Sequence, residues 1–154
     1  MQEGEVMARP VKFEIEGMKE LEQTIRKLGK LPQKCVTKAA RKGAQIALQA
    51  AKQKAPFLTG ALVEGIILKA EKTKKKGKKV YQVTMNPAMN DVFVKTTKDG
   101  KRYYYPASQE YGFITRNGGY VPGFHFLRDS LVDNKEKIEK TVVEVLAREI
   151  DKLR

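Results

Sequence analysis

Apolar residues recur at helical spacing in three parts of the chain and alternate with polar residues in several others. Residues 11–17 alternate, which predicts a half-buried strand, and the apolar positions of residues 18–28 then fall on one face of a helix. A second, long helix is predicted at residues 33–54, because this stretch lacks proline and its apolar side chains, mostly small, share one face. Small side chains on that face would let another element pack close to the helix backbone.

Strands are predicted next, because Val, Ile, Leu and aromatic residues are concentrated in short runs. Asp99-Gly100 lies between the last two runs and predicts a tight hairpin turn with positive φ at both positions. The predicted strands are residues 62–70, 80–85, 92–97 and 101–105.

The remainder is predicted to be helix and loop. Residues 105–112 favour a short helical turn, residues 117–119 a flexible loop, and the apolar stripe from Leu127 to Leu153 one last helix. The order of elements indicates an α+β fold, in which an antiparallel sheet of about four strands packs against two N-terminal helices and a long C-terminal helix. We expect residues 1–10 to be a flexible tail and residues 11–154 to form a single domain.

Positive charge is concentrated in the first four fifths of the chain. The net charge is +13, but residues 126–154 hold seven basic and seven acidic side chains, so the excess lies before them. Such a surface attracts polyanions, although a lysine-rich hairpin tip can also be simple solvated surface. The candidate basic interaction face comprises Lys34, Lys38, Arg41, Lys42 and Lys52 on the long helix, and Lys74, Lys75, Lys76, Lys78 and Lys79 in a predicted hairpin.

The sequence gives no support to an enzyme. His125 is the only histidine and no nucleophile or acid follows it in the order of a catalytic relay, while the single cysteine, Cys35, falls on the apolar face of the long helix. The acidic residues lack metal-ligand spacing, and no glycine-rich phosphate loop is present. We therefore expect no catalytic residue, metal, cofactor or small-molecule substrate. No apolar run approaches the roughly 20 residues of a membrane helix, so no membrane partner is expected.

Residues 55–62, Ala-Pro-Phe-Leu-Thr-Gly-Ala-Leu, should end the long helix with a sharp turn. Pro56 cannot continue a helix because it lacks an amide hydrogen, and Gly60 can adopt backbone angles that other residues avoid.

Four segments, taken in order, resemble the tailed-phage head–tail joining proteins, also called tail-completion or minor structural proteins, of the gene-product-10-like type. They are residues 13–21, residues 55–62, residues 105–112 and residues 122–131. Asp129-Ser130 departs from the resemblance, because the family often has Pro-Ala there. The residues that match the family's motifs are Gly17, Pro56, Thr59, Gly60, Leu62, Glu110, Gly112, Pro122, Phe126, Leu127 and Arg128.

The resemblance implies a non-enzymatic virion protein, made in the host bacterial cytoplasm and encoded by a phage or prophage. It would act as a head–tail connector, assembled as a hexameric ring between the connector and the tail tube. Its partners would be further copies of itself and other virion proteins of the connector and tail, and non-specific contact with DNA is an additional partner hypothesis.

A basic nucleic-acid-binding module is the alternative, because the order of helix, strands and helix is similar to that of double-stranded-RNA-binding domains. Against it, the start of the last helix carries Asp129, Asp133 and Glu136 where such a domain needs lysines for phosphate. A basic ribonuclease fits less well, since no acid/base pair is present. Tight nucleic-acid binding at physiological salt would favour these alternatives over the adaptor.

Overall fold

The computed structural model describes residues 19, 23 and 33–152. The helices are α2 (Gln33–Lys54), α3 (Ala61–Gly65), the 3-10 turn η1 (Pro87–Met89), α4 (Asn90–Phe93), α5 (Tyr105–Tyr111), α6 (Phe126–Val132) and α7 (Lys135–Asp151). The strands are β1 (Ile66–Ala70), β2 (Tyr81–Met85), β3 (Val94–Thr96), β4 (Arg102–Tyr104), β5 (Gly112–Ile114) and β6 (Tyr120–Pro122). Lys19 and Gln23 are helical; the rest of the strand and helix predicted before residue 29, with Gly17, lies outside the described residues.

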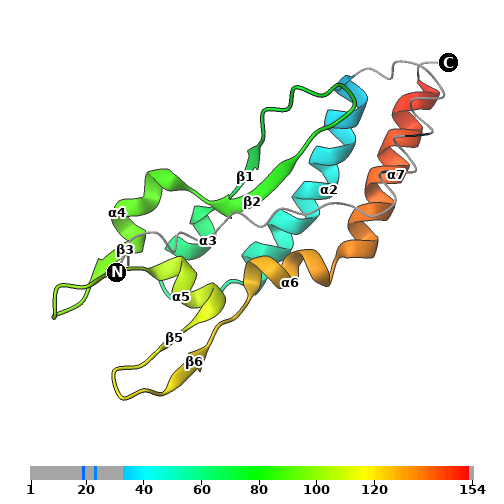
Figure 1. The fold of residues 1–154 in the computed structure, drawn as a ribbon. Coiled ribbons are helices and arrows are strands. Elements are labelled where there is room, and N and C mark those ends of the chain that lie inside the picture. Colours follow the sequence, from blue (N-terminus) through cyan, green and yellow to red (C-terminus); the bar gives the residue numbers. More distant parts are fainter. Residues whose placement is uncertain (1–18, 20–22, 24–32, 153–154) are drawn as a thin grey trace.

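The two long helices, α2 and α7, run side by side and form the main packing layer (Figure 1). They are antiparallel, because Lys54 at the end of α2 forms an ion pair with Asp133 just before α7, while Lys38 near the start of α2 pairs with Glu149 near the end of α7 at 2.6 Å. The hydrogen bond from Lys38, together with one from Lys152, holds the pKa of the Glu149 carboxyl below its usual range.

Small residues allow these helices to approach closely. The long helix predicted at residues 33–54 is confirmed, and its buried face is Cys35, Val36, Ala39, Gly43, Ala44, Ala47 and Ala51. At Gly43 the approach is closest, since a Cβ atom there would lie 2.5 Å from Cγ2 of Val142 in α7. A hydrogen is therefore the only side chain that fits at this position without a shift of the neighbouring helix.

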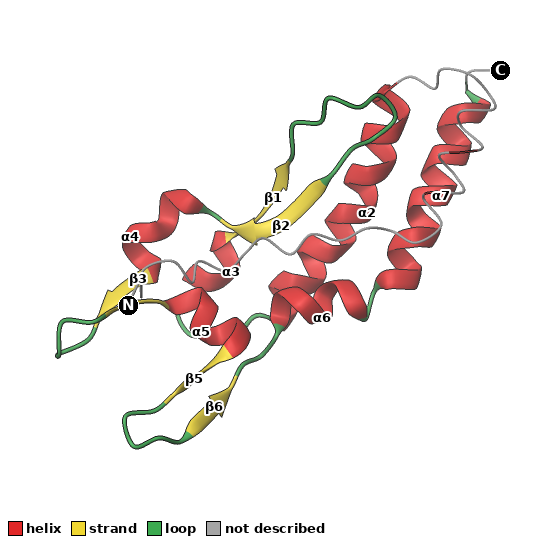
Figure 2. Cartoon of the chain, in the orientation of Figure 1, coloured by secondary structure: helices red, strands yellow, loops and turns green. Residues whose placement is uncertain are grey.

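The strands form three separate hairpins (Figure 2), and the predicted single sheet of about four strands is not found among the described residues. The α+β class itself is correct. Two of the predicted strands are shorter than expected because their first residues form helical turns, α3 and α4. The 3-10 turn η1, which leads directly into α4, has its own local start signals: Asn86 Oδ1 accepts a hydrogen bond from the Ala88 N–H at 3.0 Å, and Pro87 is its first residue.

The predicted hairpin around Asp99-Gly100 is present, but its turn differs from the prediction. Among the described residues only His125 and five glycines have positive φ, so Gly100 (φ 79°) adopts this conformation and Asp99 does not. Thr97 and Lys101 close the loop, with the Thr97 N–H donating to the Lys101 carbonyl at 2.8 Å. This is a longer turn ending in a left-handed glycine rather than the two-residue turn expected.

The hairpins and the shorter helices contribute large side chains to a core shared with α2 and α7. Phe93, Phe126, Ile66, Ile138 and Leu146 are all almost fully buried. Phe93 contacts Tyr104 edge to face, with ring centroids 6.1 Å apart, and burial raises the pKa of the Tyr104 hydroxyl.

Two predictions at the C-terminal end have different outcomes. The short helix predicted at residues 105–112 is confirmed as α5. The prediction of a single last helix is wrong, because Asp133-Asn134 separates two helices, α6 and α7. The Asn134 side chain donates to the Ser130 carbonyl at 2.9 Å and so satisfies an oxygen at the end of α6.

We predict that Gly43→Ala lowers the free energy of unfolding by about 1–2 kcal/mol. The methyl group would collide with Val142, at a typical overpacking cost of about 1–3 kcal/mol, which outweighs the gain of up to about 1 kcal/mol in helix propensity. Urea denaturation measures the change. Gln49→Ala, at an exposed position of the same helix, should be neutral or slightly stabilising; a Gly43→Ala protein more stable than wild type would contradict the close approach.

Candidate functional site: a hairpin mounted on Glu110

The β5–β6 hairpin extends away from the helices and exposes apolar side chains (Figure 1). Phe113 pairs with Val121 and Ile114 with Tyr120 across the two strands. Directly opposed residues of an antiparallel pair point to the same side, and neighbours along a strand point to opposite sides, so each face of the hairpin carries one pair. Ile114 is 76% exposed and Tyr120 63%. We call Phe113, Ile114, Tyr120 and Val121 the apolar hairpin surface.

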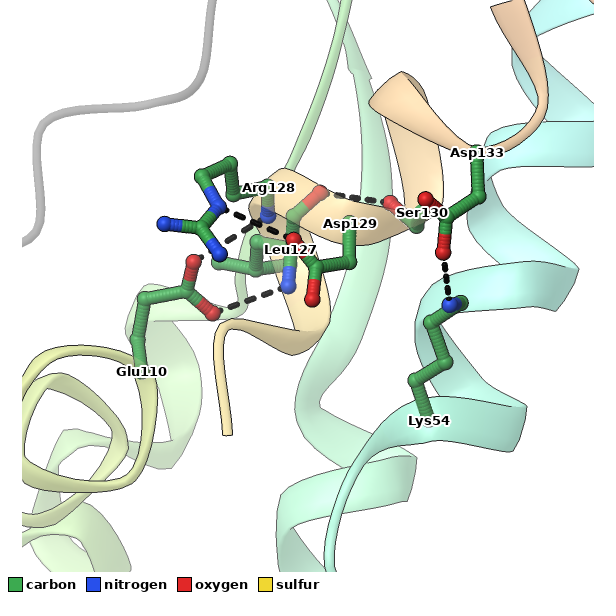
Figure 3. Close-up of polar contacts among 7 residues, drawn as sticks. All are labelled: Lys54, Glu110, Leu127, Arg128, Asp129, Ser130 and Asp133. Atoms are coloured by element: carbon green, nitrogen blue, oxygen red, sulfur yellow. Dashed lines mark hydrogen bonds and ion pairs between the residues drawn. The ribbon is translucent and has the colours of Figure 1, made fainter. Parts of the chain in front are cut away.

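Glu110 joins the base of this hairpin to α6. Its side chain is 2% exposed, and its carboxylate accepts hydrogen bonds from the backbone N–H of Leu127 at 2.8 Å and of Arg128 at 3.1 Å. Figure 3 shows the carboxylate facing the first turn of α6. These amides have no partner within their own helix, so a negative side chain there satisfies them and interacts favourably with the helix dipole. We call this contact the Glu110 junction.

The backbones on both sides of the hairpin base also touch. The Phe124 N–H donates to the Gln109 carbonyl at 2.7 Å, and the His125 N–H donates to the Glu110 carbonyl at 3.1 Å. Gly112 (φ 83°) and Gly123 face each other across this contact: a Cβ atom on Gly112 would lie 2.2 Å from the Val121 carbonyl oxygen, and one on Gly123 2.2 Å from the Glu110 carbonyl oxygen. The hairpin is therefore held at its base in one orientation.

The start of α6, which the Glu110 carboxylate contacts, is fixed by buried side chains and by hydrogen bonds within the helix. His125 precedes the helix in the left-handed conformation (φ 50°), and Phe126 and Leu127 are buried. The buried Ser130 hydroxyl donates to the Leu127 carbonyl at 2.6 Å, while Arg128 pairs on the surface with Asp129 at 2.9 Å (Figure 3). Ser130, one of the two residues that depart from the resemblance, thus makes an internal hydrogen bond.

The third and fourth segments that resemble the phage family, residues 105–112 and 122–131, lie in contact in the structure. Glu110 and Gly112 contact the stretch that contains Pro122, Leu127 and Arg128, and Gly112 pairs with Pro122 across the hairpin. The second segment lies elsewhere, between α2 and α3. There Gly60 has the predicted unusual conformation (φ 84°), Leu62 is 3% exposed, and the Thr59 hydroxyl accepts from the Ala61 N–H at 3.4 Å.

The same turn exposes a second apolar pair, Phe57 and Leu58, each 78% exposed. Pro56 is half-buried between this pair and the end of α2. The expectation of a sharp turn after the long helix is thus confirmed.

The ten residues of the candidate basic face do not share one environment. Lys34, Arg41, Lys42, Lys74, Lys75, Lys76 and Lys78 are exposed, whereas Lys52 and Lys79 are half-buried. Lys38 is exposed but pairs with Glu149. Lys79 Nζ donates to the Glu71 carbonyl at 3.3 Å and lies 5.6 Å from the centre of the Tyr81 ring.

The described residues hold no cluster of His, Cys, Asp and Glu suited to a metal ion. Cys35 is a buried free thiol, as expected for a core position, and His125 is a backbone-strained residue at the start of α6. Within the part of the chain that the structure describes, no helix is long and apolar enough to cross a membrane.

Sequence reasoning missed the apolar hairpin surface, because it predicts a flexible loop at residues 117–119 and no strand on either side of that loop. The available signal was the pair of short apolar runs, Phe113-Ile114 and Tyr120-Val121, on either side of Asn117-Gly118-Gly119. Gly123 was also missed as a contact position, and nothing local to it predicts the approach of Glu110.

We predict that Glu110→Ala lowers the free energy of unfolding by about 3–5 kcal/mol, because two amides lose a charged acceptor in a buried place. Glu110→Gln keeps one acceptor oxygen and should cost about half as much. Urea denaturation of both proteins tests this. Glu144→Ala, at an exposed position of α7, serves as control and should change stability by less than about 0.5 kcal/mol. A Glu110→Ala protein as stable as this control would contradict the assigned role.

Comparison with known proteins places the chain in a family. Residues 19–108 match the family model described as "Bacteriophage HK97-gp10, putative tail-component". The match spans α2, the turn at Gly60 and the first two hairpins, and it ends in α5 just before Glu110. No curated protein and no solved structure matched the chain. Because the family model covers more than half of the sequence, the chain belongs to this family of bacteriophage tail components.

Proposed function

We propose that this protein is a non-enzymatic adaptor that completes the junction between head and tail of a phage or prophage particle. The coarser statement, a phage structural component, follows from family membership. The adaptor role is supported mainly by one observation: a hairpin with apolar side chains on both faces is fixed by the Glu110 junction in an exposed position.

An exposed apolar hairpin of this kind is suited to protein contacts. Two three-residue strands cannot form a stable unit alone in water, yet this hairpin has an ordered base and no covering element among the described residues. Aromatic and large aliphatic side chains at the centre of an interface contribute most of its binding energy. Since both faces are apolar, the hairpin fits best between two protein surfaces rather than against one.

A ring gives such a hairpin two neighbours. Contacts between successive copies in a ring are head-to-tail, so one surface of each copy meets a different surface of the next. The chain has two separate exposed apolar features, the apolar hairpin surface and the Phe57-Leu58 pair, as this kind of contact requires. We propose that copies form a ring, a hexamer as the family resemblance implies, between the connector and the tail tube in the virion.

We predict that Phe113→Ser with Ile114→Ser leaves the chain folded but prevents it from joining heads to tails. The strands lie outside the buried core, so circular dichroism and the midpoint of unfolding should stay close to wild type. Loss of each of these two apolar side chains should weaken the free energy of docking by about 2 kcal/mol or more, which is at least about 30-fold in affinity for each. Complementation of a phage that lacks the gene, with electron microscopy of the particles, measures joining.

Val132→Ser with Val143→Ser is the matched control, because these helix residues are 64% and 53% exposed and lie outside the hairpin. The control should restore joined particles as well as wild type does. If the hairpin variant also restores them, or if particles without the protein join normally, the proposed role is wrong.

A further inference from the structure

Two basic segments that are far apart in the sequence meet at one end of the molecule. The Gln33 side chain, at the start of α2, accepts from the Gly77 N–H at 2.8 Å and donates to the Lys78 carbonyl at 3.0 Å. The same carbonyl accepts from the Thr73 hydroxyl at 2.9 Å. The loop between β1 and β2 is thereby held against the first turn of α2, as Figure 1 shows.

The lysines at this end of the molecule form no ion pair within the described part of the chain. Lys34, Lys74, Lys75, Lys76 and Lys78, which we call the basic end, are exposed, and none forms an ion pair with a residue that the structure describes. Residues 72–79 contain no acid. Glu149, near the end of α7, is already paired with Lys38 and Lys152. These five like charges thus have no ion-pair partner among the described residues, and their mutual repulsion weakens the folded state unless a counter-charge binds.

The side-chain chemistry favours phosphate over a protein surface. Protein interfaces are enriched in aromatic residues and Arg and depleted in Lys, whereas the basic end is made of lysine alone and residues 72–79 of its loop include no apolar side chain. Flexible lysine side chains act as point charges and bind regularly spaced phosphates without base-specific contacts.

The position of the basic end agrees with a separate role. It lies at the start of α2, whereas α5, α6 and the β5–β6 hairpin lie toward the other end of that helix (Figure 1). A helix of 22 residues is about 33 Å long, so the two surfaces can be occupied at once.

We propose that the basic end binds the phosphate backbone of duplex DNA, independently of the base sequence. Each copy makes four or five phosphate contacts, and Gln33 is the positioning residue that holds the loop lysines beside Lys34. This site is independent of the adaptor role, because a single copy in solution contains all of it.

Fluorescence anisotropy with a labelled random duplex of about 20 bp tests the site across salt concentrations. The wild type should bind weakly, with Kd of about 1–100 µM at low salt, and log K should fall with log salt with a slope of about −4. Lys74→Gln with Lys75→Gln and Lys76→Gln should lose at least tenfold in affinity and flatten the slope by about 2.5. Gln33→Ala, which changes no charge, should weaken binding about two- to fivefold.

The matched control replaces Lys95, Lys98 and Lys101 by Gln in the β3–β4 hairpin, where three lysines are equally exposed. This control removes the same net charge and should keep most of the affinity and slope. Equal losses in both triple variants would overturn the site, since only net charge would matter. We expect no binding of poly-L-glutamate. If poly-L-glutamate binds and the DNA duplex does not, the proposed DNA site is wrong and an acidic protein is the better candidate partner.

Discussion

The buried carboxylate of Glu110 is the interaction on which the presentation of the apolar hairpin surface depends. It satisfies two amides at the start of α6, and its own backbone carbonyl accepts a third hydrogen bond from the chain entering that helix. One residue thus fixes α5, the base of the hairpin and α6 together. The glycines at positions 112 and 123 make this possible, because any larger residue would separate the two backbones. His125, whose N–H makes that third hydrogen bond, has a left-handed backbone conformation (φ 50°).

The molecule divides its surface chemistry between its two ends. Around α2 and α7 the packing depends on small side chains, and this leaves α2 free to carry cations along its other side. Lysines gather at the start of α2, where Gln33 holds a basic loop, while exposed apolar side chains gather beyond its end. An arrangement of this kind lets a subunit contact proteins at one end and a polyanion at the other without either contact blocking the second. Among the described residues the strands form separate hairpins, not the single sheet typical of a double-stranded-RNA-binding domain.

Sequence patterns predicted the elements whose conformation depends on neighbouring residues. They did not predict the contacts between residues that are far apart in the chain. The helix α2 and the turn at Gly60 follow from composition and spacing within a few residues, and both are found as expected. The predicted strand at residues 62–70 begins instead as α3, because the Glu64 N–H bonds back to the Gly60 carbonyl at 3.0 Å and competes with the extended conformation. The Glu110 junction joins residues 17 and 18 positions apart, and periodicity carries no information on such a contact. Glu110 was singled out only by its resemblance to a family motif, without a reason for its importance.

The central claim is that the apolar hairpin surface is covered by another protein in the assembled particle. A photoreactive amino acid introduced at Ile114 tests it most directly, with the same amino acid at Lys98, on the tip of the β3–β4 hairpin, as reference. Irradiation of joined particles followed by mass spectrometry identifies any protein attached at each position. The account predicts adducts at position 114 with a second copy of the chain or another virion protein, and few at position 98. Particles that contain the protein but yield no adduct at position 114 would contradict it.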